Sequence, residues 1–308
     1  MLIENFRPGT LERWGLGPER LHELHPGLVI ARVSGYGQTG RYASRPGFAS
    51  AGEAIGGLRY INGYPGEVPP RPGVSLGDSL ASVFAMQGVL LALYNRDVHG
   101  GGGQVVDAAI NESCLAVLDS TVPEYGKVGA IRQPGGSRIG SAVPSNLYRS
   151  RDGKHVVVGA NAEGLFRRLC AAMGQPELAE DERFCTHWAR FEHVDELDRI
   201  IGEWTAQHDA DELDRMLTEA GVVSAPVYTI ADIFEDPQYE EREMLLRCQD
   251  PELGELVLPG IVPKLSETPG EVRWTGPWEL GPHNREVYGE LLDLTPEDLD
   301  GLAARHVV

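Results

Sequence analysis

The sequence predicts a mixed α/β protein in which a large first part is followed by a smaller α+β part and a C-terminal return. Three observations indicate this fold. The stretch 27–37 (GLVIARVSGYG) is an apolar strand entering a glycine-rich turn. The stretch 77–97 carries apolar residues at helical spacing and is the clearest helix. From about residue 145 the pattern changes to a strand pair followed by amphipathic, acid-rich helices.

The remaining elements follow from local patterns. The chain opens on what resembles the end of a buried strand breaking into a loop, LIENFRPGT. A hairpin is expected around Asp152-Gly153, and a helix start at Thr295-Pro296-Glu297. The other expected elements are a short helix in 48–63, strand then helix in 104–120, helices in 163–174, 194–207 and 210–221, strand and short helix in 222–239, a β region in 254–270 and a helical end in 284–308. The predicted division is 1–125, 126–230 and 231–308.

The composition is ordinary for a globular protein, with 308 residues, 42% hydrophobic and 24% charged. No apolar run is read as long enough for a membrane span, and the N-terminus lacks the pattern of a secretory signal. The four cysteines are far apart, which favours a reduced, cytoplasmic chain without a metal site. A net charge of −19 argues against nucleic acid or an anionic membrane as partner.

The charge is uneven, because residues 1–50 hold six basic and four acidic side chains. This stretch is therefore where an anion site is expected, although solvated arginines on loops explain the same count. The bases are Arg7, Arg13, Arg20, Arg32, Arg41 and Arg45.

Two glycine-rich stretches have structural explanations. The stretch 35–40 fits G-x-G-x-x-G after a strand, but a dinucleotide site needs a helix to open at once, and Pro46-Gly47 prevents a continuous helix. The four glycines at 100–103 lie where a helix is expected to end.

The stretch 76–79 (LGDS) places Asp78 at the start of the clearest helix. Asp78 there is either a plain N-cap or a carboxylate held ionised by the helix dipole and able to attack an activated acyl group. Gly77 would allow a substrate to approach the backbone closely.

Several stretches together resemble family III CoA-transferases, the group that contains formyl-CoA transferase and the CaiB/BaiF proteins. The two specific ones are LIENFRPGTLERWGLG (2–17) and GVSLGDSLA (73–81). The resemblance runs in order to the C-terminus through the supporting stretches 31–48, 101–110, 144–158, PGIVPKLSETPG and LGPHNREVYGELL.

The resemblance implies that Asp78 is the catalytic nucleophile, forming an aspartyl anhydride and then an aspartyl-CoA thioester. It implies that coenzyme A is a substrate, with no tightly bound cofactor and no metal. The residues expected to contact coenzyme A are Asn5, Phe6, Thr10, Arg13 and Arg45. A lid loop over the aspartate is expected in 134–141, with Gly135, Gly136 and Gly140 as its glycines.

The implied fold is a Rossmann-like large domain built from both chain ends plus a smaller domain, with two chains interlocked as a homodimer. The stretch GFASAGEAIGGLRYING (47–63), together with an APSNLY-like context, most resembles members acting on dicarboxylates such as succinate, malate or citramalate. The stretch LIENFRPG is normally preceded by further strand–helix units that are absent here, so Met1 is expected not to be the true start.

Two departures from the family pattern, and the absence of the preceding strand–helix units, leave alternatives open. Phe48 stands where the racemases of the family have a second catalytic base, which disfavours an acyl-CoA racemase. Ala49 stands at an often acidic position. The other alternative is an inactive or binding-only truncated fragment.

Overall fold

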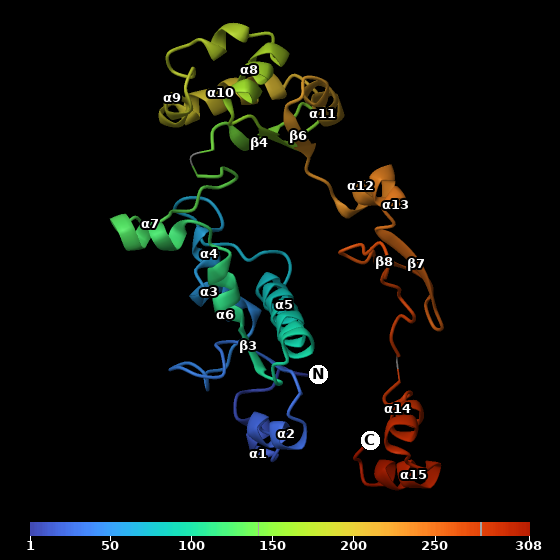
Figure 1. The fold of residues 1–308 in the computed structure, drawn as a ribbon. Helices are drawn as coiled ribbons and strands as arrows, with labels where there is room; N and C mark the ends of the chain where they lie inside the picture. Colours follow the sequence, from blue (N-terminus) through green and yellow to red (C-terminus); the bar gives the residue numbers. More distant parts are fainter. Residues whose placement is uncertain (141, 278) are drawn as a thin grey trace. The chain divides into compact units, whose positions relative to one another are not determined.

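The computed structural model describes residues 1–140, 142–277 and 279–308 and divides into two compact units, Met1–Pro226 and Val227–Val308 (Figure 1). The first contains a parallel sheet with helices around it, so the predicted mixed α/β class is confirmed. The division at 1–125, 126–230 and 231–308, and the joining of both chain ends into one large domain, stay predictions.

A three-stranded parallel sheet lies at the start of the N-terminal unit. Its strands are β1 (Leu2–Glu4), β2 (Ile30–Ser34) and β3 (Val105–Ala109), with β2 in the centre. Parallel strands need long crossovers, and helices fill both of them. The crossovers contain α1 (Thr10–Arg13), α2 (Pro18–Leu24), α3 (Ala49–Ile55), α4 (Leu58–Ile61) and α5 (Leu76–His99). No helix follows the glycine turn at 35–40 before α3, as the sequence predicted.

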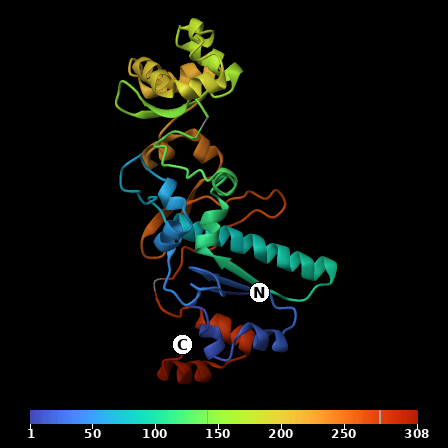
Figure 2. The same cartoon turned by 90° about the vertical axis from the view of Figure 1, so that its left-hand side faces the viewer.

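The long helix α5 packs against β2 and β3 and is the main cover of this sheet (Figure 2). Its small buried residues recur at helical spacing and let the helix approach the strands closely. They are Ala81, Ala85, Val89 and Ala92. The helix ends at Gly100, which has left-handed backbone (φ 70°), so the four glycines do mark a helix end.

The expectation that no apolar run is long enough for a membrane span was wrong for α5. Its 24 residues include an 18-residue window of mean hydropathy 1.6, which passes by length and composition. Core helices of soluble proteins pass the same test, and α5 packs on the sheet through one face. Its opposite face is apolar and exposed, at Val83, Met86, Leu90, Leu91 and Tyr94.

A second sheet, also in the N-terminal unit, is antiparallel and contains β4 (Ser145–Arg149), β5 (His155–Gly159) and β6 (Val223–Pro226). The predicted hairpin turn at Asp152-Gly153 is confirmed, with Gly153 at φ 83°. The predicted helices of this region also form. They are α8 (Glu163–Ala172), α10 (Val194–Thr205) and α11 (Ala210–Glu219), with α6 (Ile110–Ala116), α7 (Thr121–Val128) and α9 (His187–Glu192) elsewhere in the unit. Phe166, Leu197 and Leu213 are almost completely buried in its core.

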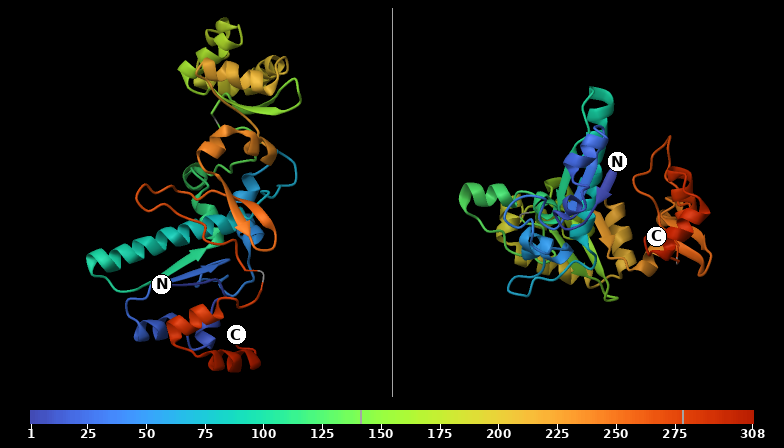
Figure 3. Two further views of the ribbon diagram at one scale, coloured as in Figure 1. Left: turned by 90° about the vertical axis from the view of Figure 1, so that its right-hand side faces the viewer. Right: turned by 90° about the horizontal axis from the view of Figure 1, so that it is seen from below.

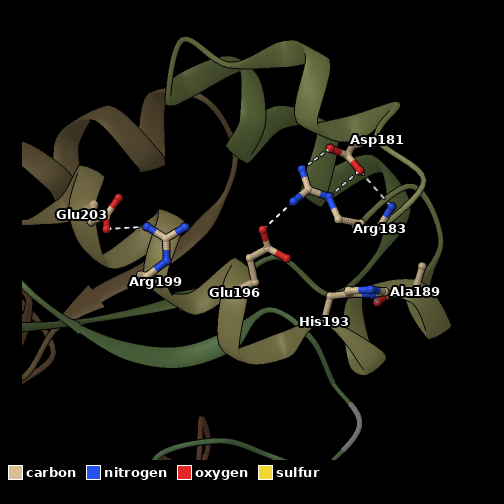
Figure 4. A network of polar contacts seen from close by, with 7 residues as sticks. All are labelled: Asp181, Arg183, Ala189, His193, Glu196, Arg199 and Glu203. Atoms are coloured by element: carbon tan, nitrogen blue, oxygen red, sulfur yellow. Dashed lines mark hydrogen bonds and ion pairs between the residues drawn. The ribbon is translucent and has the colours of Figure 1, made fainter.

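A polar network joins the loop before α9 to α10 (Figure 4). Arg183 donates from Nη2 to Asp181 at 2.6 Å and also pairs with Glu196. The hydrogen bonds from the Arg183 side chain, followed by its backbone N–H, lower the pKa of Asp181 to about 2.

The C-terminal unit begins with two short helices and a hairpin (Figure 3). Its elements are α12 (Ile230–Glu235), α13 (Pro237–Glu241), β7 (Leu245–Asp250), β8 (Gly254–Pro259), α14 (Asn284–Leu292) and α15 (Pro296–Ala304). The predicted β region 254–270 is strand only to Pro259, because prolines interrupt the stretch that follows. The predicted helix start is confirmed: Thr295 accepts a hydrogen bond from the Asp298 N–H, with Pro296 in the first turn.

Candidate active site

A cavity of about 650 Å³ lies at the carboxyl edge of the parallel sheet. The ends of the strands meet there, since Asn5 follows β1, Ser34 ends β2 and Ile110 follows β3. Ligands of open parallel sheets bind outside this edge, and the volume is in the range of small-molecule sites. Asp78 and Ser82 of α5 complete the lining on the helix side.

Asp78 lies in the first turn of α5 and is exposed. The N-cap is Ser75, so the interpretation of Asp78 as a plain N-cap was wrong. Among the described residues the Asp78 carboxylate has no hydrogen-bond or ion-pair partner. The positive end of the helix dipole lies at this turn, where it stabilises negative charge that develops during a reaction. Asp78 is therefore an exposed carboxylate at the cavity, without a partner among the described residues.

The backbone before Asp78 is held by a buried acid. Glu53 of α3 has no exposed surface, and its Oε1 accepts a hydrogen bond of 3.1 Å from the Gly77 N–H. The Ser75 side chain makes no cap hydrogen bond, so Glu53 supplies the acceptor that an N-cap side chain normally provides.

A second cavity, of about 220 Å³, shares Asn5, Ser34 and Phe48 with the first and is basic. Arg7 and Arg45 line it, and neither forms an ion pair within the described chain. The guanidinium of Arg45 lies over the rings of Tyr36 and Tyr42, at 5.8 and 5.3 Å from their centroids. An arginine oriented by aromatic rings and lacking a carboxylate partner is suited to bind phosphate.

The structure brings three of the five predicted coenzyme A contacts into this cavity, namely Asn5, Phe6 and Arg45. The other two, Thr10 and Arg13, lie on α1 outside its lining. There Arg13 Nη2 donates to Thr10 Oγ1 at 2.8 Å.

The loop that carries Asn5 and Phe6 is anchored by a buried ion-pair network. Arg32 of β2 donates from Nε to Glu4 at 2.6 Å and from Nη1 to Glu12 at 2.8 Å. The other oxygen of Glu4 accepts from the Phe6 N–H at 2.7 Å. The hydrogen bond from Arg32 lowers the pKa of Glu12. Arg32, counted among the bases of residues 1–50, is thus committed to internal pairs.

The predicted lid glycines lie at a different cavity, of about 420 Å³, which shares no lining residue with the Asp78 cavity. Gly135 and Gly140 line it. Gly136 has left-handed backbone (φ 66°) and donates its N–H to the Gly63 carbonyl at 2.8 Å. Ser141, the last residue of the predicted segment, lies outside the described residues.

Sequence reasoning missed several residues at the two cavities. Glu53 carried no motif signal, because nothing in the sequence marks an acid in this short helix as buried. Ser34 lines both cavities, and its Oγ is buried without a partner in the described chain. Phe48 was singled out only as a departure, yet it lines both cavities and is 67% exposed.

The fold and the cavities define a class: an α/β enzyme with an available carboxylate beside a basic, phosphate-compatible cavity. The sequence matches the profile of CoA-transferase family III over residues 1–284. It is 51% identical to succinyl-CoA–D-citramalate CoA-transferase of Chloroflexus aurantiacus over 308 residues, covering 100% of this chain and 76% of that protein.

Two further comparisons agree. The chain is 41% identical over 309 residues to the alpha subunit of succinyl-CoA–L-malate CoA-transferase of Chloroflexus aurantiacus, covering 100% of this chain and 72% of that protein. It resembles the crystal structure of a CaiB/BaiF family protein from Brucella suis with a TM-score of 0.78 and 29% identity, over 94% of this chain and 74% of that one. The chain belongs to CoA-transferase family III, so the resemblance stated from the sequence is confirmed and the protein is a CoA-transferase.

Proposed function

We propose that this chain moves coenzyme A from succinyl-CoA to a dicarboxylic acid, with Asp78 as the nucleophile. One observation carries the proposal. The Asp78 carboxylate has no partner in the described chain and lies at a cavity that shares lining residues with the basic cavity of Arg7 and Arg45. The citramalate and malate transferases similar to this chain support succinyl-CoA as donor and a hydroxylated dicarboxylate as acceptor.

The first half of the reaction transfers coenzyme A to the enzyme. An Asp78 oxygen attacks the thioester carbonyl carbon, the C–S bond breaks, and coenzyme A leaves as thiolate. The product is a mixed anhydride of Asp78 and succinate. The thiolate then attacks the Asp78 carbonyl carbon, the anhydride C–O bond breaks, and succinate leaves while Asp78 carries coenzyme A as a thioester.

The second half reverses these steps with the acceptor. Its carboxylate attacks the carbonyl carbon of the aspartyl thioester, and the C–S bond breaks to release the thiolate. The thiolate then attacks the acceptor's carbonyl carbon in the new anhydride, and the bond from that carbon to the Asp78 oxygen breaks. The acceptor leaves as its CoA thioester, and Asp78 is again a carboxylate. Each step places negative charge near the N-terminus of α5, where the helix dipole stabilises it.

Coenzyme A is proposed to lie with its phosphates at Arg45 and its thioester toward Asp78. Arg7, Asn5 and Phe6 line the same path, which supports this orientation. Thr10 and Arg13 on α1 are proposed to contact the outer part of the ligand. We expect Arg45→Ala to raise the KM for succinyl-CoA about 10- to 150-fold while changing kcat little, because removing a charged hydrogen bond to substrate costs about 1.5–3 kcal/mol.

Assembly, lid and location complete the proposal. One face of α5 is apolar and exposed in the single chain, and such a face is commonly covered by another protein chain. This supports a homodimer, which sedimentation velocity tests. Gly135, Gly136 and Gly140 are proposed to move over Asp78 during the reaction, supported by the left-handed backbone of Gly136 and Gly140. The four free cysteines support a reduced, cytoplasmic location.

Trapping the covalent intermediates tests the central step. The chain is incubated with succinyl-CoA and borohydride or hydroxylamine, and peptides are analysed by mass spectrometry. Modification is expected at Asp78 and absent in Asp78→Ala, which should bind coenzyme A in calorimetry but not transfer it. Asp97→Asn is the matched control, because Asp97 is an exposed carboxylate on the same helix and lies at its other end.

Other outcomes point to other functions. Normal turnover by Asp78→Ala contradicts the proposal. Exchange of the substrate α-proton without acyl transfer would indicate a racemase. Neither modification nor coenzyme A binding would indicate a fragment that does not act alone.

A further inference from the structure

We propose that Glu53 is a positioning residue for Asp78: it holds the first turn of α5 through the Gly77 N–H and so leaves the Asp78 carboxylate free to face the cavity. This rests on the proposed role of Asp78 as nucleophile. The donor of the hydrogen bond that Glu53 accepts is the Gly77 N–H, which belongs to the residue immediately before Asp78.

The burial of Glu53 is the first argument. A carboxyl side chain without exposed surface is costly to bury and is seldom retained without a partner. Its only hydrogen bond within the described chain goes from the Gly77 N–H to Oε1, while Oε2 is buried without a partner. Within the described chain this buried acid therefore makes one hydrogen bond, and its donor is the backbone beside the proposed nucleophile.

The packing around Glu53 is the second argument. Helices α3, α5 and α6 meet so closely that a Cβ on Gly52 would lie 2.4 Å from Ile110 Cγ2, and a Cβ on Gly77 would lie 3.0 Å from the same atom and 3.3 Å from Glu53 Cγ. Glycines at both positions let the helices approach until the carboxylate reaches the backbone. Ile110 also lines the Asp78 cavity, so this contact forms one wall of the site.

The use of the helix N-terminus is the third argument. A carboxylate in a first turn commonly folds back onto unpaired N–H groups, which would turn Asp78 away from a substrate. Glu53 already accepts from the Gly77 N–H, the Leu76 N–H bonds the Val74 carbonyl at 2.9 Å, and the Ser79 N–H bonds the Ser75 carbonyl at 3.1 Å. These three donors are occupied, which leaves fewer N–H groups to draw the Asp78 carboxylate away from a substrate.

The test separates the acceptor oxygen from the bulk of the side chain. Glu53→Leu keeps the volume but removes the acceptor, and Glu53→Gln restores an acceptor oxygen at the same place. We expect Glu53→Leu to lower kcat about 100-fold with the KM for succinyl-CoA changed less than about threefold, since a 1 Å displacement of a reacting group costs about that much. Glu53→Gln should recover kcat to within about threefold of the unaltered protein.

Separate controls test whether the variants fold and whether the effect is specific to Glu53. Glu112→Gln alters an exposed acid on α6 and should leave both constants unchanged. Circular dichroism reports whether Glu53→Leu is folded, and if it is not, Glu53→Asp replaces it, because the shorter acid keeps its charge but withdraws the acceptor from Gly77. Unaltered kcat in the folded variant, or equal losses in it and Glu53→Gln, would overturn the proposal.

Asp78→Asn distinguishes this inference from the proposed function. If Asp78→Asn retains turnover, the nucleophile itself is misassigned. If Asp78→Asn is inactive while Glu53→Leu keeps full kcat, only the positioning role fails.

Discussion

Replacing Arg32 by methionine removes the one cation that the described residues contribute to the ion-pair network of Arg32, Glu4 and Glu12, which anchors the loop carrying Asn5 and Phe6. The side chains of Arg32 and Glu4 are 6% and 2% exposed, whereas that of Glu12 is 40% exposed. After the substitution Glu4 stays buried without a counter-charge, while Glu12 can turn to water. Breaking a buried pair in this way costs about 3–5 kcal/mol, so we expect the free energy of unfolding to fall by that amount, mostly through Glu4.

The assay is urea unfolding at pH 7 followed by circular dichroism, with the linear extrapolation applied to each variant. Arg20→Met is the matched control, because Arg20 pairs with Glu23 on the surface, where the side chains are 56% and 65% exposed. An exposed pair of this kind contributes about 0–1 kcal/mol. Arg32→Met combined with Glu4→Gln should recover part of the loss, since neither buried charge then remains.

A loss below about 1 kcal/mol in Arg32→Met would refute the reasoning, because it would mean that Glu4 is not effectively buried. A second readout concerns function. Glu4 accepts from the Phe6 N–H, so loosening Glu4 should raise the KM for succinyl-CoA more than it lowers kcat.

Three other outcomes are expected. Asp181 should titrate near pH 2 by NMR, as its pKa is about 2, and Arg183→Ala should raise that pKa toward the ordinary value of about 3.9. Glu12 has a lowered pKa in the folded chain. The stability that its ionised carboxylate contributes is therefore fully present above the unfolded-state pKa of about 4.3 and is lost as pH falls through the folded-state pKa. The difference in free energy of unfolding between the unaltered protein and Glu12→Gln should shrink in acid. Cys185 is exposed and should react with iodoacetamide in the native state, whereas Cys114, buried and with a pKa raised mainly by burial, should react only after unfolding; equal rates would contradict the described burial.

Much of the fold could be predicted, because its signals are local. The period of α5, the turn at Asp152-Gly153 and the cap at Thr295 depend on residues within a few positions of one another, and all three formed as expected. The stretch after Pro259 was predicted to continue the β region to residue 270, but its prolines cannot donate to a sheet.

The sequence predicted which kinds of residue form the candidate site, but it predicted their arrangement only in part. The sequence singled out Asp78 and a basic N-terminal stretch, and Asn5, Phe6 and Arg45 do line one cavity. The count of charges could not separate Arg45, which has no carboxylate partner in the described chain, from Arg32, which pairs with Glu4 and Glu12; only the family resemblance named Arg45. Pairing depends on which strand and helix meet, and charge counts carry no such information.

The sequence by itself determined the family, the α/β class and the aspartate at the start of the long helix, since each is carried by contiguous motifs. Only the tertiary structure decided that Asp78 is not the helix cap, that Glu53 takes the Gly77 N–H, and that Gly135 and Gly140, both predicted to be in a lid loop, line a separate cavity. The last two facts depend on contacts between residues more than twenty positions apart, where the distance of approach is set by packing rather than by local preference.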